Sequence, residues 1–166
     1  MNAALPALSV LVAVLATAVP FELPTVATFI LPMVVVTMVF CWRAFPGTVF
    51  PLSLGFLLGL LTDILSGGPL GFWALMAVIA ANAGSAAPPL DNSLDRNRLW
   101  LIWAGVAFSI GALSWLLCSL YLFRVADIRP IALGASVSIL LFPLLSRLLV
   151  RIKGGSFRPK FYRGWT

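Results

Sequence analysis

The feature that most constrains this chain is a series of long apolar stretches, each bounded by a short segment rich in proline, glycine or charge. A bilayer core about 30 Å thick is crossed by roughly 20 residues of α-helix. The strands of a membrane β-barrel would instead alternate polar and apolar residues over about 10 positions, and these stretches are apolar on every side. The pattern predicts an all-α integral membrane protein, a bundle of six transmembrane helices at about residues 3–19, 25–42, 48–65, 70–87, 99–123 and 130–150.

The composition agrees with lipid as the solvent for most of the chain. Of 166 residues, 61% are hydrophobic and only 10% are charged, and the mean hydropathy is +1.08. Soluble domains have about 45–50% apolar and about 25% charged residues. We therefore expect one transmembrane domain at 1–150, followed by a basic tail at 151–166. The first stretch is the least secure span, because Ala16-Thr17-Ala18 is typical of a signal-peptide cleavage site.

The charges predict the orientation. Cytoplasmic flanks of membrane proteins carry an excess of Lys and Arg, and the tail has only basic charges: Arg151, Lys153, Arg158, Lys160 and Arg163. With six spans both termini are then cytoplasmic, Arg43, Arg96 and Arg98 lie in inner loops, and Glu22, Arg124, Asp127 and Arg129 lie outside. The net charge of +6 is interpreted as a topology signal and as contact with anionic lipid, not as binding of nucleic acid.

The sequence offers little for catalysis. It contains no histidine, which removes a Ser–His dyad and a HExxH zinc site. Cys41 and Cys118 are expected near opposite faces of the membrane and cannot share a metal. Asp63 is the one acid inside a predicted span, so paired-carboxylate chemistry is absent. We expect no enzyme, no metal site and no cofactor.

Asp63 lies on a helix face with Gly55 and Gly59, because the three are four residues apart. Small residues at this spacing let another helix approach closely, so Asp63 is expected to point into a protein interface. Two interpretations stay open. As a structural group it would accept hydrogen bonds from the glycine-rich turn at 66–71, or from a hydroxyl such as that of Ser109 or Ser138. As a functional group it would be a proton or ion site; this is disfavoured because no series of polar groups accompanies it.

Other spans repeat the small-residue spacing, and one does not. The second span is bulky and β-branched, so we expect it to be peripheral, with the third to sixth helices forming the close-packed body. Pro32 and Pro143 lie inside spans, where a neighbouring helix must satisfy the freed carbonyl. The small faces in the fourth to sixth spans are Ala77, Ala81 and Ser85; Gly105 and Ser109; and Gly134 and Ser138.

The string GFLLGLLTDILSGGPLG, with Pro51 upstream, resembles the signature stretch of MreD, the family of bacterial rod-shape-determining membrane proteins. The ending FPLLSRLLVRIK is also similar, and the length, the six spans and the basic tail fit along the whole chain. The bulky Phe72-Trp73 after the motif departs from the smaller or more polar residues expected there. The motif residues, including the close-packing Gly55, are Gly55, Gly59, Asp63, Gly67, Gly68, Pro69 and Gly71.

The resemblance implies a non-catalytic scaffold of the cell-elongation machinery in the bacterial inner membrane. Such proteins associate with MreC, and through it support the RodA polymerase and its transpeptidase partner in peptidoglycan synthesis, under cytoplasmic MreB filaments. The family is also similar to the six-helix substrate-binding subunits of ECF-type vitamin transporters. That similarity supplies the alternative, a small-molecule-binding membrane subunit. Its site would need convergent polar and aromatic groups in an outer cavity, for which the chain offers Asp63, Arg124, Asp127, Arg129, Trp115 and Tyr121.

Overall fold

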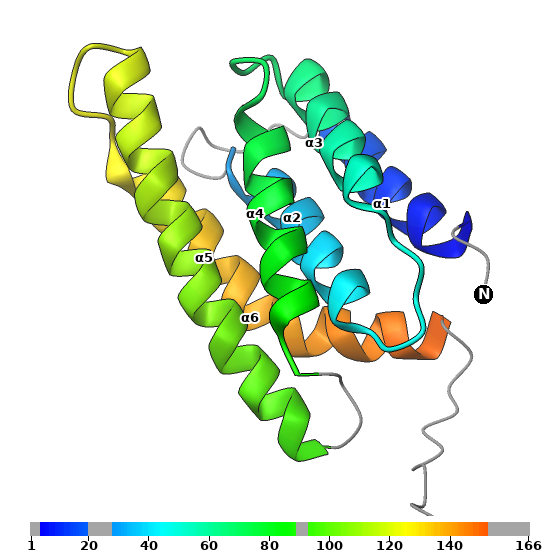
Figure 1. The fold of residues 1–166 in the computed structure, drawn as a ribbon. Helices are drawn as coiled ribbons and strands as arrows, with labels where there is room; N and C mark the ends of the chain where they lie inside the picture. The colour runs from blue at the N-terminus through cyan, green and yellow to red at the C-terminus, as the bar shows by residue number, and fades with distance from the viewer. Residues whose placement is uncertain (1–3, 20–27, 89–92, 153–166) are drawn as a thin grey trace, which may run out of the picture.

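Helices account for most of the described residues in the computed structural model, which describes residues 4–19, 28–88 and 93–152. They are α1 (Ala4–Thr17), α2 (Ile30–Ala44), α3 (Leu52–Ser66), α4 (Phe72–Ala86), α5 (Ser93–Tyr121) and α6 (Ile128–Ile152). No strand occurs in these ranges, and successive helices run in alternating directions (Figure 1). The predicted all-helical class is confirmed.

The helices fall into two length classes. The long helices α5 and α6 have 29 and 25 residues, and both are long and apolar enough to cross a membrane. The helices α1 to α4 have 14 or 15 residues, or about 21–23 Å at 1.5 Å per residue, which is less than the predicted spans. The segments between these helices are longer than expected. Pro51 immediately precedes α3, and Gly67 and Gly71, both with positive φ, end α3 and precede α4. Conversely, α5 begins six residues before the predicted position 99.

The second helix is the centre of the bundle, so the prediction that it is peripheral is wrong. Eleven of its fifteen residues are buried; α4 and α6 pack against it most extensively, and α1 also contacts it. Its bulky side chains fill the interior while the small residues sit on the helices that surround it. In the ribbon, α2 passes behind α4 and between α5 and α3 (Figure 1).

Small residues mark where neighbours approach the backbone of α2. A Cβ added at Gly84 would lie 2.5 Å from the Phe40 carbonyl oxygen, and one added at Gly134 would lie 2.9 Å from the Phe29 Cβ. Gly84, not Ser85, is thus the contact residue of α4, since Ser85 is exposed. Gly105 and Ser109 are also exposed, so the small face expected on α5 makes no close helix contact among the described residues.

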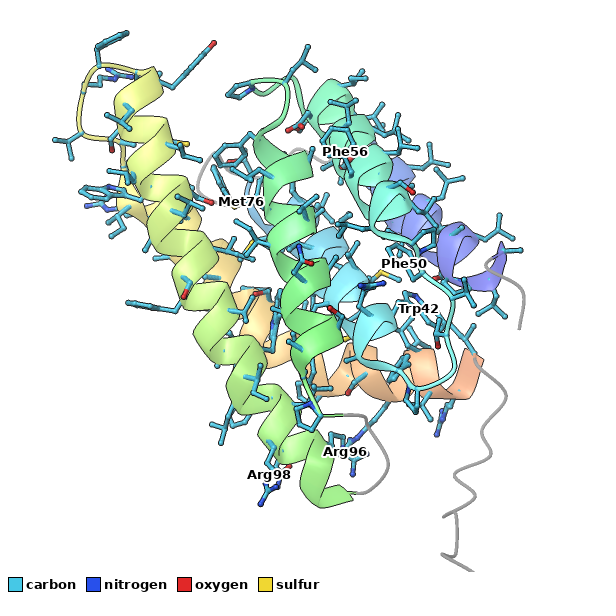
Figure 2. The ribbon with its side chains drawn as sticks, in the orientation of Figure 1. Trp42, Phe50, Phe56, Met76, Arg96 and Arg98 are labelled. Carbon is cyan, nitrogen blue, oxygen red and sulfur yellow. The ribbon has the colours of Figure 1, made fainter. Side chains whose placement is uncertain are left out.

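Four of the arginines gather at one end of the bundle. Arg43 and Arg151 lie in the last turns of α2 and α6, and Arg96 and Arg98 lie near the start of α5, at the end opposite the α3–α4 turn (Figure 2). Arg43 is partly buried and donates from Nη1 to the Phe50 carbonyl at 2.7 Å and from Nε to a carbonyl of α4 at 3.2 Å. It therefore ties the end of α2 to the loop before α3 and to α4.

Pro143 lies inside α6, as the sequence indicated, and the helix changes direction along its length (Figure 1). A proline has no N–H to offer the carbonyl four residues earlier, which here is Ile139. The Trp100 indole of α5 donates to that carbonyl at 2.9 Å. The expectation that a neighbouring helix satisfies a carbonyl freed by proline is confirmed at this position.

Candidate functional site

The turn between α3 and α4 is built on glycines. Gly67 caps α3 with φ 67° and Gly71 precedes α4 with φ 94°, and both values lie in the left-handed region that side-chain-bearing residues rarely adopt. Gly67, Gly68, Pro69 and Leu70 are exposed. The turn therefore stands at the end of the bundle away from Arg96 and Arg98 (Figure 2) and presents its surface outward.

Asp63 is fully buried at the foot of this turn and binds the start of α4. Its Oδ2 accepts from the Gly71 N–H at 2.9 Å and the Ala74 N–H at 3.3 Å, and its Oδ1 accepts from the Trp73 N–H at 2.7 Å. The first N–H groups of a helix have no partner within the helix, and a carboxylate there also complements the positive end of the helix dipole. Asp63 thus caps α4 from the neighbouring helix, an arrangement that we call the Asp63 clamp.

The clamp agrees with the structural interpretation of Asp63, although its donors differ in part from those expected. Only Gly71 belongs to the predicted 66–71 turn; the other two donors lie in the first turn of α4. The hydroxyls considered as alternatives bond their own helices, Ser109 to Gly105 O and Ser138 to Ala135 O. The sequence did contain a signal for the donors in α4, because a helix that starts near residue 71 has first N–H groups with no partner inside the helix.

Gly59 permits the clamp by allowing the two helices to touch. A Cβ added there would lie 2.6 Å from the Ala74 Cα and 2.8 Å from the Trp73 carbonyl oxygen, so no larger residue fits unless the backbones separate. Gly55 is buried as predicted, but its added Cβ would meet the Phe50 ring at 3.4 Å, near ordinary contact distance. The close approach predicted for both glycines therefore holds at Gly59 alone.

A cavity of about 310 Å³ lies beside the turn, between the start of α2, the start of α4 and the end of α5. Four of its lining residues are aromatic. Among them, Phe29 packs edge-on against Phe72 at 6.2 Å and Trp73 at 5.3 Å between ring centroids. The bulky pair after the motif thus forms a cavity wall while the Trp73 main chain serves the clamp. The lining residues are Thr28, Phe29, Pro32, Ser66, Gly68, Pro69, Phe72, Trp73, Leu117, Cys118, Tyr121 and Leu122.

The other residues considered for a binding site are not brought into this cavity. Arg124, Asp127 and Arg129 lie exposed at the α5–α6 connection. The Trp115 indole donates to the Ala126 carbonyl at 3.0 Å and so holds that connection in place. Of the residues proposed from the sequence for a small-molecule site, Tyr121 alone lines the cavity, together with Gly68 and Pro69 of the motif. Comparison with protein-family models, with curated proteins and with solved structures gives no match for this chain.

Proposed function

We propose that this chain is a non-catalytic membrane scaffold related to MreD, which binds MreC in the bacterial inner membrane and so supports peptidoglycan synthesis and rod shape. RodA, its transpeptidase partner and MreB would belong to the same assembly. The observation that carries the proposal is the Asp63 clamp: both carboxylate oxygens are used by main-chain donors of α4, and the side chain is fully buried. These contacts support a role for Asp63 in ordering the α3–α4 turn.

The surface that the clamp orders is the exposed α3–α4 turn. Leu70 at its tip is 74% exposed, between a glycine-rich segment and the capped start of α4. A rigid turn with an exposed apolar tip suits contact with a partner, because little conformational entropy is lost when it binds. We propose that MreC, or the part of it outside the membrane, contacts this turn.

The proposed topology is six spans with both termini cytoplasmic. It is supported by the alternating helix directions (Figure 1) and by Arg43, Arg96, Arg98 and Arg151 at one end of the bundle. The shorter helices α1 to α4 would be completed by apolar residues of their flanking segments. Arg124 and Arg129 would then face the outside together with Asp127.

The alternative is a small-molecule-binding subunit of a transporter, and the aromatic cavity beside the turn is the observation that favours it. Its volume of about 310 Å³ lies at the lower end of the range for ligand pockets, roughly 300–1,000 Å³. Such sites also need a few converging polar groups, and Asp63 is sealed by the clamp while Arg124, Asp127 and Arg129 lie elsewhere. The scaffold is therefore preferred.

The test is purification of the tagged chain from native membranes, with mass spectrometry of the proteins and small molecules that accompany it. MreC in the complex supports the scaffold, whereas a vitamin together with an ATPase module supports the alternative. Leu70→Glu places a charge on the turn and should remove MreC. Phe123→Glu is the matched control, because Phe123 is 97% exposed on the other loop at the same end and should leave MreC bound. Equal MreC recovery with both variants would exclude the turn as the contact.

A further inference from the structure

α6 contains Pro143 and receives a hydrogen bond from another helix four residues before it. Without a proline N–H, the Ile139 carbonyl has no helical donor, and the Trp100 indole supplies one at 2.9 Å. Trp100 is 38% exposed, so this bond lies at the edge of the α5–α6 contact and not deep in the core. This hydrogen bond joins α5 to the middle of α6.

Trp103, one turn further along α5, carries a buried side-chain donor next to α6. Its ring is fully buried and packs against Phe142 at 6.3 Å with 17° between the planes, and against Phe40 at 4.9 Å. Its Nε1–H has no partner among the described residues. A buried donor without an acceptor is costly, so a displacement of α6 that brought a carbonyl within reach of this N–H would gain free energy.

The part of α6 beyond Pro143 leads to a second hollow. It crosses the lower end of the bundle (Figure 1), and Ile152 at its end lines a hollow of about 760 Å³ with residues of α1, with Trp42 and with Val49. A change in the angle of α6 at Pro143 would therefore move one wall of this hollow.

We propose that Pro143 is a hinge in α6, that the Trp100 indole is the latch that holds the observed angle, and that release of the latch moves Ile152 and opens the hollow against α1. The unpaired N–H of Trp103 favours the released position, and the Trp100 bond favours the latched one. The proposal holds whichever partner the protein binds, so it stands or falls separately from the proposed function.

The experiment measures the distance between spin labels on cysteines at Leu101 and Arg151, both exposed, in full-length protein without the two native cysteines. Trp100→Phe keeps a ring and removes the latch. Since loss of one partly exposed hydrogen bond shifts an equilibrium by roughly 2- to 13-fold, this variant should populate a second distance. Trp103→Phe removes the unpaired donor and should narrow the distribution to the latched distance.

Two further variants make the test decisive. Trp115→Phe removes a comparable indole–carbonyl bond from the same helix, to Ala126, and should leave the distance unchanged. Pro143→Ala restores an N–H for Ile139, so Trp100→Phe should have no effect in that background, on folding or on distance. The proposal is overturned if Trp100→Phe and Trp103→Phe change the distance in the same way. It is equally overturned if Trp100→Phe has the same effect with and without Pro143.

Discussion

Replacing Asp63 by Asn should weaken the clamp in proportion to the one acceptor that is lost. The carboxylate offers two oxygens, and Asn offers one. With the amide oxygen in place of Oδ2, the bonds from Gly71 and Ala74 remain, and the amide NH2 group faces the Trp73 N–H that Oδ1 accepted at 2.7 Å. The opposite orientation loses two bonds instead of one and is less favourable.

The size of the effect follows from these contacts. One buried N–H without a partner costs about 1–3 kcal/mol, and loss of the negative charge at a helix N-terminus costs about 0.3–1 kcal/mol more, or up to about 2 kcal/mol when partly buried. We expect Asp63→Asn to lower the free energy of unfolding by about 2–4 kcal/mol. Asp63→Leu leaves both Trp73 and Ala74 without an acceptor, and they are buried, so it should cost about 2–6 kcal/mol from these donors alone.

The assay is unfolding of the purified protein in detergent, combined with MreC recovery and cell shape for each variant. The matched control is Asp127→Asn, because Asp127 is an exposed carboxylate that accepts one N–H, from Arg129 at 3.0 Å, and should change stability little. The clamp has no energetic role if Asp63→Asn is as stable as the parent. A proton or ion site is indicated instead if Asp63→Asn and Asp63→Leu both fold and bind MreC but are equally inactive.

Three further outcomes are expected. Gly59→Ala should destabilise the protein by about 1–3 kcal/mol through overpacking, because the added Cβ meets backbone atoms of α4. Gly105→Ala is the control: its Cβ meets nothing within 4 Å, so it should be neutral or slightly stabilising. Equal effects of the two substitutions in a thermal melt would contradict the close contact at Gly59. Arg43→Met should cost about 1–3 kcal/mol because carbonyls that now accept from the guanidinium lose their donor, and an unchanged melt would exclude this role. Single cysteines at Asn92 and Asp127, without the native cysteines, should label from opposite sides of the membrane, and labelling from one side would refute six spans.

The sequence by itself determined the helical class, because the long stretches between proline and glycine breaks are apolar on every side, whereas the strands of a membrane barrel alternate polar and apolar residues. It also determined that Asp63 shares a face with Gly59, because residues four apart align on any α-helix. The 66–71 turn was placed correctly for the same local reason: two of its glycines adopt a positive φ. These properties depend on residues near one another in the chain.

Only the tertiary structure decided which helix lies at the centre. Bulky residues on α2 are compatible with a lipid-facing helix or with a buried one. The buried position depends on Gly84 and Gly134, which are distant in the chain and lie against the backbone of Phe40 and Phe29. The donors to Asp63 and the Trp100 bond to Ile139 were undetermined for the same reason. Helix periodicity predicts which face a residue occupies, but the partner on that face is set by the packing of other helices, whose register and angle a local pattern does not encode.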